Sequence, residues 1–215
     1  IKSYAKINLL LKVNSKFKNG LHDIQSFFCL IDLSDKIKIK KNQKKKDQIK
    51  FIGPFSKFVK LKKNSVNILL KNLRDLRLIS GHYSVTITKN IPILAGLGGG
   101  TSNAAFLMKY LLKKKASGNL QNRFEKIIGS DLKIFFKRQG FLQNLKKIKT
   151  FKKKQNFYFV LAQPKIKCST KEIYSKVKKF SKKEKFNKNM MIKKNKFLDY
   201  LSKNRNDLQF IVERK

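Results

Sequence analysis

A glycine-rich loop followed by an apolar helix is the part of this sequence best suited to bind a ligand. Glycine occupies four of the five positions from 96 to 100, so backbone N–H groups there can approach a bound molecule closely. The apolar residues that follow recur at helical spacing, and a helix N-terminus offers unpaired N–H groups and partial positive charge to a phosphate. The sequence therefore predicts a nucleotide phosphate loop. Its residues are Pro92, Ile93, Leu94, Ala95, Gly96, Leu97, Gly98, Gly99, Gly100, Thr101 and Ser102.

Two familiar glycine motifs do not match this loop. A Walker loop requires a lysine before its Ser or Thr, and the loop contains no lysine. A dinucleotide-binding fingerprint requires different glycine spacing and an acidic residue about 20 positions downstream. The alternative interpretation is a glycine turn that only caps a helix. The hydroxyls of Thr101 and Ser102, which could cap the helix or contact a phosphate-bound Mg²⁺, and the nearby Pro92 favour the phosphate loop.

The chain is strongly basic, with 53 Lys and Arg against 12 Asp and Glu and a net charge of +41. Such a charge raises nucleic acid or a membrane surface as a partner. The basic residues are spread along the whole chain, however, and Lys, Asn, Ile and Phe are plentiful while Trp is absent, which is typical of A+T-rich coding sequence. We therefore expect no specific nucleic-acid partner.

No apolar run approaches the roughly 18 residues of a membrane span, and no signal peptide is recognisable. Cys29 and Cys168 have no metal-ligand spacing and are predicted to be buried free thiols, so no metal-binding residue is predicted. These observations predict a cytoplasmic protein without a membrane partner.

The elements around the loop follow from hydrophobic periodicity. Residues 4–13 alternate as in a strand, which places Lys6 and Asn8 on the same face. Residues 41–50 are predicted to be a charged loop, and Ser169 and Glu172 have the spacing of a capping box. Strands are predicted over 4–13, 24–33, 36–40, 83–87 and 157–161, and helices over 66–76, 102–115, 119–128 and 169–180.

Three stretches together resemble one enzyme superfamily. Residues 5–9 read Ala-Lys-Ile-Asn-Leu and are followed by Gly-Leu-His at 20–22, the glycine loop continues as Thr-Ser-Asn-Ala-Ala to 105, and residues 129–133 read Gly-Ser-Asp-Leu-Lys. In this order and spacing the chain is similar to the GHMP superfamily of small-molecule kinases. Within it, the chain most resembles the kinases of a cytidine-diphosphate-linked methylerythritol in the non-mevalonate isoprenoid pathway.

The resemblance covers essentially the whole chain and implies an α+β fold with two domains. The N-terminal ATP-binding domain would span 1–145 and contain a mostly antiparallel sheet with helices. The C-terminal α/β domain, ferredoxin-like and truncated, would span 146–215. The family's third motif, a Thr-Gly-(Ser/Thr)-Gly loop, is absent, and Asn-Asp-Leu at 206–208 looks like the segment ahead of it. We therefore expect a C-terminally incomplete sequence with weak activity or none.

The resemblance also implies a reaction and its residues. The γ-phosphoryl group of ATP, bound with Mg²⁺, would pass to the 2-hydroxyl of the substrate, with Asp131 as general base. Lys6 would lie beside Asp131, polarise the hydroxyl and help to keep the carboxyl ionised. Asn8 and His22 would contact the cytidine diphosphate part of the substrate. Without the resemblance, each residue has a more ordinary interpretation. Asp131 would be a turn or helix-cap residue, Lys6 a solvated lysine on a strand, and His22 a histidine that makes a structural hydrogen bond.

The chain departs from the family pattern at several positions. Leu21 stands where the family usually has Tyr, so stacking on cytosine from that position is lost; Tyr174 or a phenylalanine could compensate. Lys133 replaces a proline, and Leu94 and Ala95 replace glycines at the loop entrance.

Two alternatives stay open. One is another GHMP kinase, acting on homoserine or on a mevalonate, although Lys6, Asn8 and His22 together favour the cytidine-linked substrate. The other is a basic RNA-binding protein, since the superfamily's N-terminal domain resembles a fold also used in ribosomal proteins. The predicted partner is a small-molecule substrate, and the sequence does not predict an oligomeric state.

Overall fold

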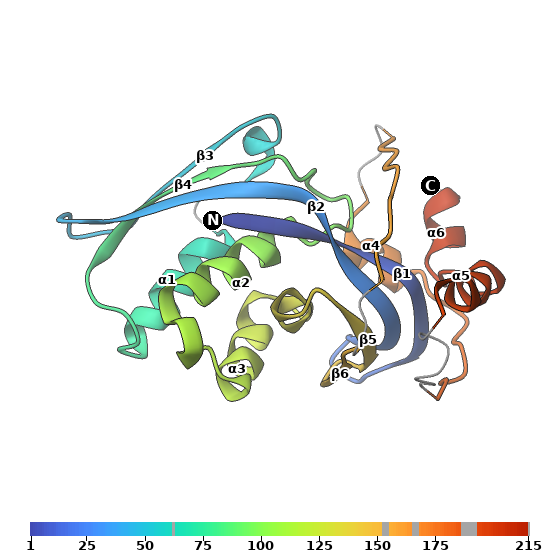
Figure 1. Ribbon diagram of the computed structural model, residues 1–215. Helices are drawn as coiled ribbons and strands as arrows, with labels where there is room; N and C mark the ends of the chain where they lie inside the picture. The colour runs from blue at the N-terminus through green and yellow to red at the C-terminus, as the bar shows by residue number, and fades with distance from the viewer. Residues whose placement is uncertain (62, 152–154, 165–167, 186–192, 215) are drawn as a thin grey trace. The chain divides into compact units, whose positions relative to one another are not determined.

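The computed structural model describes residues 1–61, 63–151, 155–164, 168–185 and 193–214 (Figure 1). The chain forms two compact units. The first unit comprises Ile1–Lys6, Leu30–Ile93 and Leu97–Phe136, and the second comprises Ile7–Cys29, Leu94–Gly96 and Lys137–Lys215. Strands β1 (Lys2–Lys16) and β2 (His22–Asn42) each contribute residues to both units.

The sheet of the first unit contains β3 (Gln48–Ile52), β4 (His82–Thr88) and the second half of β2. Strand β4 is parallel to β3 and antiparallel to β2, with Ile87 opposite both Phe51 and Ile37. The prediction of a loop over 41–50 is wrong at both ends, since β2 continues to Asn42 and β3 begins at Gln48. Strand β3 forms there because Ile49 and Phe51 pack against the core while Lys50 between them is exposed.

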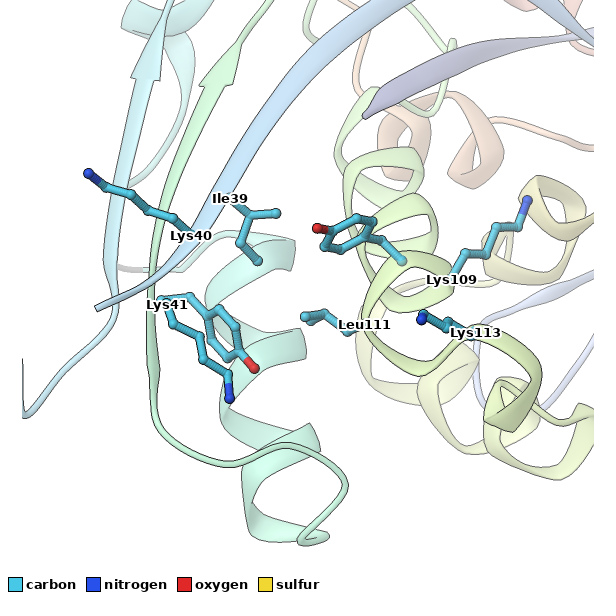
Figure 2. Close-up of a pocket in the computed structure, with 8 residues that line it drawn as sticks. Ile39, Lys40, Lys41, Lys109, Leu111 and Lys113 are labelled. Atoms are coloured by element: carbon cyan, nitrogen blue, oxygen red, sulfur yellow. The ribbon is translucent and has the colours of Figure 1, made fainter. Parts of the chain in front are cut away.

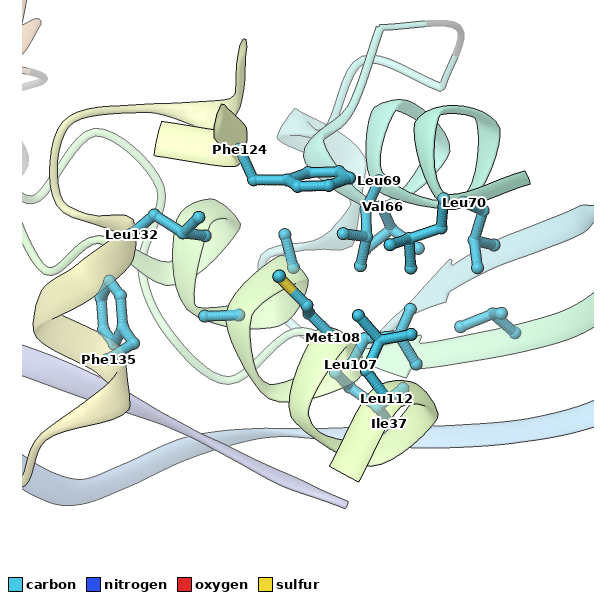
Figure 3. Packing of buried hydrophobic residues seen from close by; sticks show 14 of the residues in the cluster. Ile37, Val66, Leu69, Leu70, Leu107, Met108, Leu112, Phe124, Leu132 and Phe135 are labelled. Carbon is cyan, nitrogen blue, oxygen red and sulfur yellow. The ribbon is translucent and has the colours of Figure 1, made fainter. Parts of the chain in front are cut away.

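Three helices pack on the inner face of this sheet: α1 (Ser65–Asp75), α2 (Gly99–Leu112) and α3 (Gly118–Ile128). Their apolar stripes and the inner strand residues form one core, part of which Figure 3 shows. The residues labelled there are Ile37, Val66, Leu69, Leu70, Leu107, Met108, Leu112, Phe124, Leu132 and Phe135. The helix predictions in this unit are confirmed, except that α2 begins earlier than predicted, within the glycines, and ends at Leu112 rather than at residue 115. Three short 3₁₀ helices, η1 (Ser56–Phe58), η2 (Lys113–Lys115) and η3 (Leu132–Phe136), complete the unit.

The second unit pairs the first half of β2 with β5 (Gln139–Asn144), which also pairs with β6 (Lys147–Lys149). An aromatic core containing Phe27, Phe141 and Phe197 joins these strands to α5 (Lys194–Lys203). The described residues of this unit also form the helices α4 (Thr170–Ser175) and α6 (Gln209–Glu213).

Two local predictions in the second unit are wrong. Residues 157–161 form no strand, and the side chains of Tyr158 and Val160 are 95% and 99% exposed. Helix α4 ends at Ser175, and Ser169 stands at its N-cap without a side-chain hydrogen bond. Beyond the helix, Ser181 N–H donates to Val13 O of β1 at 2.8 Å.

The elements are those of the α+β class predicted from the sequence, and that prediction is confirmed. The division into family domains at residue 145 stays a prediction. In the part of the chain that the structure describes, no helix has the length and apolar character needed to cross a bilayer.

Candidate active site

The glycine loop ends in helix α2 with the geometry expected of an anion-binding helix start. Gly98 is the N-cap residue and adopts a left-handed conformation with φ of 69°. The first helical hydrogen bond runs from Ser102 N–H to Gly98 O at 2.9 Å, so the N–H groups of Gly99, Gly100 and Thr101 precede it and lack helical acceptors. Because Gly98, Gly99 and Gly100 have no side chains, a ligand can approach these N–H donors closely.

Gly98 is required by its contacts as well as by its backbone. A Cβ atom there would lie 2.7 Å from Cζ of Phe135 in η3 and 3.6 Å from Cγ of Lys6. The loop, the start of β1 and η3 therefore meet at this residue. Leu94, at the loop entrance, also adopts a left-handed conformation with φ of 61°, where the family's glycine would be unstrained.

The two hydroxyls after the glycines are placed differently. Ser102 is fully buried, and its Oγ donates to Tyr4 O at 2.6 Å and lies 2.8 Å from Ser3 Oγ. This hydroxyl ties α2 to β1. Thr101 is half-buried, and its Oγ1 lies 3.3 Å from where a Cβ on Gly129 would stand, near the segment that carries Asp131. Between Thr101 and Ser102, Thr101 is therefore the residue whose hydroxyl can contact a ligand bound at the loop.

Lys6 and Asp131 form an ion pair in the first unit. Lys6 Nζ lies 3.2 Å from Asp131 Oδ2, with side-chain exposures of 6% and 30%. The Lys6 backbone N–H donates to Leu97 O at 3.1 Å, which fixes β1 against the loop. Asp131 follows Gly129, which adopts φ of 150°, and its carbonyl accepts from Ile134 N–H at 3.1 Å. A buried ammonium and a partly exposed carboxylate thus face each other near the helix start.

A second ion pair supports the turn that presents Asp131. Lys133 Nζ lies 2.7 Å from Glu125 Oε2 of α3, and both side chains are largely buried. Burial raises the pKa of Glu125, the charge of Asp131 adds to this effect, and Lys133 opposes it. The sequence marked Lys133 only as a departure from proline and gave no reason to single out Glu125.

Replacing Lys133 by methionine should destabilise the protein in a pH-dependent way. Glu125 would lose the cation that opposes its raised pKa, at a cost of about 2 kcal/mol at pH 7.5. An acid whose pKa is raised on folding binds its proton more readily in the folded state, so lowering the pH through that pKa should shrink the difference. Urea unfolding at pH 7.5 and pH 5 measures this. Equal losses at both values would contradict a role for the Glu125 charge.

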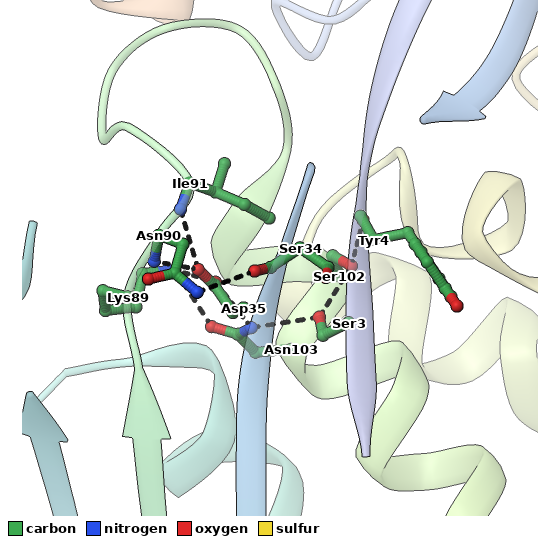
Figure 4. Close-up of polar contacts among 9 residues, drawn as sticks. All are labelled: Ser3, Tyr4, Ser34, Asp35, Lys89, Asn90, Ile91, Ser102 and Asn103. Carbon is green, nitrogen blue, oxygen red and sulfur yellow. Dashed lines mark hydrogen bonds and ion pairs between the residues drawn. The ribbon is translucent and has the colours of Figure 1, made fainter. Parts of the chain in front are cut away.

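A buried polar network lies behind the loop (Figure 4). Asp35 of β2 is fully buried and pairs with Lys89, which follows β4 and is 2% exposed. Asp35 also accepts from the N–H groups of Asn90 and Ile91 at 2.8 and 2.9 Å, and from Asn103 Nδ2 of α2 at 2.9 Å. A Cβ on Gly99 would stand 3.3 Å from Lys89 Nζ. The network therefore anchors both ends of the glycine loop.

The predicted substrate residues Asn8 and His22 belong to the second unit. His22 is 8% exposed, and its ring centroid lies 5.1 Å from that of Tyr174 and 6.4 Å from that of Phe180. Burial, with a smaller contribution from the charge of Lys16, lowers the pKa of His22, so the imidazole is neutral at physiological pH.

The half-buried Asn8 is held by a neighbouring strand, since its Oδ1 accepts from Ser26 Oγ at 3.0 Å. Leu21 is 48% exposed. Tyr174, which was expected to compensate for Leu21, lies beside His22, and so does Phe180.

Both cysteines are free. Burial raises the pKa of the Cys29 thiol to about 12, which leaves it unreactive. Cys168 is partly buried, and its backbone N–H donates to Leu94 O at 3.3 Å, at the entrance of the glycine loop.

Comparison with known proteins gives a consistent family of relatives. No protein-family model matches the chain. A protein of Pelagibacter ubique named 4-diphosphocytidyl-2-C-methyl-D-erythritol kinase is 41% identical over 217 residues, covering 99% of this chain and 75% of the relative. A protein of the same name from Persephonella marina is 36% identical over 82% of this chain and 65% of its own length. The matched region thus spans 75% of the first relative's length and 65% of the second's.

The fold is also that of solved kinases. The crystal structure of a 4-(cytidine 5'-diphospho)-2C-methyl-D-erythritol kinase superposes with a TM-score of 0.67, covering 100% of this chain and 77% of that chain at 20% identity. The structure of the Methanococcus jannaschii mevalonate kinase gives a TM-score of 0.55 at 18% identity. At such identities the likeness concerns the fold, which is that of the GHMP kinases.

Proposed function

Because this chain belongs to the family of 4-diphosphocytidyl-2-C-methyl-D-erythritol kinases, we propose that it phosphorylates the 2-hydroxyl of that cytidine-linked alcohol with ATP, in isoprenoid precursor biosynthesis. The observation that carries the proposal is the pairing of Lys6 with Asp131 in the unit that also contains the bare start of α2. A carboxylate, an ammonium and a phosphate-binding helix start are the groups that phosphoryl transfer to an alcohol requires.

Asp131 acts as the general base. Its carboxylate takes the proton of the substrate hydroxyl as the oxygen attacks the γ-phosphorus, and the bond from that phosphorus to the bridging oxygen breaks to release ADP. Lys6, held within 3.2 Å of the carboxylate, stabilises the negative charge that develops on the attacking oxygen. The 30% exposure of Asp131 lets it reach a substrate without leaving its ion pair.

The N–H groups of Gly99, Gly100 and Thr101 bind the phosphates of ATP. The site suits Mg²⁺ held mainly by nucleotide oxygens. In the described ranges no three His, Cys, Asp or Glu side chains cluster as a metal site of protein ligands would require, while the Thr101 hydroxyl and the Asp131 carboxylate supply hard oxygen donors. When bound, Mg²⁺ would neutralise phosphate charge.

Recognition of the cytidine part rests on the second unit. His22, neutral and packed against Tyr174, offers ring nitrogens for hydrogen bonds, and Asn8 adds an amide. Tyr174 and Phe180 supply the aromatic surface that Leu21 does not.

Truncating Tyr174 should therefore weaken substrate binding more than catalysis. For Tyr174→Ala we expect KM for the cytidine-linked alcohol to rise about tenfold through lost ring contact, with kcat changed much less. Tyr174→Phe, which keeps the ring, and Tyr158→Ala, at a residue that is 95% exposed, serve as controls in steady-state kinetics. A matched fall in kcat without a change in KM would argue against this role.

The overall proposal is tested by comparing alcohols. The complete gene product is incubated with ATP, Mg²⁺ and either the cytidine-linked methylerythritol, mevalonate or homoserine, and ADP release is coupled to NADH oxidation. We expect turnover with the cytidine-linked alcohol and a phosphomonoester product by ³¹P NMR. Faster turnover of mevalonate or homoserine would contradict the substrate assignment.

A further inference from the structure

A short segment after α4 lies beside the candidate substrate residue His22, in the second unit. The segment comprises residues 180–184, and we call it the strap. The ring centroid of Phe180, at its start, lies 6.4 Å from that of His22. Next to His22 in β2, the buried Asp23 pairs with Lys183 of the strap, whose Nζ lies 2.6 Å from Asp23 Oδ2. The strap thus contacts both His22 and the residue that follows it.

The end of the strap is held by two hydrogen bonds to one side chain of β2. Glu184 N–H donates to Gln25 Oε1, and Gln25 Nε2 donates to Glu184 O, each at 2.8 Å. Gln25 is 3% exposed, so these bonds are shielded from competing water. The main chain of the strap is therefore fixed to β2 three residues after His22.

The side chain of Glu184 anchors the strap to two further elements. Its carboxylate accepts hydrogen bonds from Lys12 of β1 and from Tyr200 of α5. Burial would raise the pKa of Glu184, but these bonds and the charge of Lys12 outweigh burial and hold that pKa below its ordinary value. The carboxylate is therefore charged at neutral pH, and hydrogen bonds to a charged group are stronger than neutral ones.

The position of the strap depends on polar contacts and not on apolar burial. Its one apolar side chain, Phe180, is 46% exposed, and none of its five residues, all of them described, is buried. The chain has 12 acidic residues, and three of them, Asp23, Glu184 and Asp207, hold the strap, the last by accepting from Ser181 Oγ at 2.8 Å. Removing one polar contact should therefore loosen the strap without disturbing the aromatic core of the unit.

We propose that the strap positions His22 for the cytidine part of the substrate, with Glu184 as its anchor. The identity of that ligand rests on the proposed function. Through Gln25 and Asp23 the strap fixes the strand on which His22 stands, and through Phe180 it keeps the imidazole buried. A neutral imidazole has one donor and one acceptor, whereas a protonated one has two donors, so the strap decides which hydrogen bonds His22 makes. Glu184 is a positioning residue that acts through His22.

The first test needs no substrate. His22 and His82 are the two histidines of the sequence, so their ring protons can be followed by NMR as the pH changes, with His22→Gln identifying the signal of His22. Burial lowers the pKa of His22, so loosening the strap should move that pKa up toward the ordinary value of about 6.5. We expect this rise in Glu184→Ala and in Gln25→Met, which weaken the anchor from opposite sides, and no change for His82.

The second test separates positioning from stability. With the complete gene product, Glu184→Ala should raise KM for the cytidine-linked alcohol about fivefold, while kcat and KM for ATP stay within about twofold. Glu184→Gln, which keeps an acceptor oxygen for Lys12 or Tyr200, should recover most of the lost affinity. Glu213→Ala, which removes a carboxylate at an exposed position of α6, is the matched control and should change neither KM nor the titration of His22.

Phe180→Ala tests the contact at the start of the strap. It should also raise the pKa of His22, because a ring beside the imidazole is removed. Tyr110→Ala is the matched control and should leave that pKa unchanged. Tyr110 is a 55% exposed aromatic residue in a groove of the first unit, which residues of β2, β4 and α2 line (Figure 2).

An unchanged pKa of His22 in both Glu184→Ala and Gln25→Met would overturn the proposal, and so would a fall in kcat with KM unchanged. Thermal unfolding checks that each variant is folded, and if Glu184→Ala is not, Gln25→Met and Glu184→Gln decide the question. A raised pKa of His22 together with faster turnover of another alcohol would refute the proposed substrate but support the strap as the element that holds His22. The two proposals therefore fail by different observations.

Discussion

Replacing Asp131 by asparagine should lower kcat about a thousandfold, because the variant loses the base that accepts the substrate proton while keeping the size of the side chain. KM should change little, since the carboxylate acts on the reacting hydroxyl and not on the parts of the substrate that bind. Steady-state kinetics with the cytidine-linked alcohol gives both values. Asp75→Asn, at an exposed position of α1, is the matched control and should behave as the unmodified protein.

Variants of Lys6 provide a second test of the role of Asp131 as general base. Lys6→Met should reduce kcat to a similar extent, and the double variant should be scarcely worse than either single one, because the two groups act as a unit. Thermal unfolding must show that the variants are folded, since Lys6 is buried beside its partner. Activity of Asp131→Asn within tenfold of the unmodified protein would rule out Asp131 as the base.

The largest effect on stability is expected at Asp35. In Asp35→Asn the buried ammonium of Lys89 loses its counter-charge, which should cost about 3–5 kcal/mol. Such a loss is a large part of the roughly 5–15 kcal/mol that stabilises a typical domain. Urea unfolding measures it, and Asp32→Asn, at an exposed position of the same strand, is the control.

A double-mutant cycle tests whether the unpaired Lys89 charge causes this loss of stability. Adding Lys89→Met to Asp35→Asn removes the stranded charge and should recover part of the lost stability. If Asp35→Asn cost less than about 1 kcal/mol, or if the second change brought no recovery, the ion pair would not be what holds the ends of the glycine loop.

The parts of the site that lie close together in the sequence could be predicted from it. The glycine loop and the start of α2 follow from local spacing, and α1, α2 and α3 follow from apolar residues at helical intervals. The partnership of Lys6 and Asp131 joins residues far apart in the chain, so only the family resemblance pointed to it. Their roles in the reaction stay a prediction.

The parts that depend on distant partners could not be predicted. Asp35 and Lys89 are 54 residues apart, and among so many lysines nothing in the sequence marks Lys89 as a buried one. Strand β3 could not be recognised because its pairing with β4 decides its conformation, whereas the lysine-rich stretch just before it suggested a loop. Residues 157–161 show the reverse case, since their strand-like composition does not give them a pairing strand.

Because the Cys29 thiol is buried and unreactive while Cys168 is only partly buried, Cys168 can be labelled selectively to report on nucleotide binding. With the Cys29 thiol held protonated, a maleimide dye would attach at Cys168 alone, without any engineered residue. The backbone of Cys168 is bonded to Leu94, so the label would sit at the mouth of the glycine loop. Fluorescence from that one position would follow nucleotide arrival and departure in real time, even in preparations that turn over no substrate.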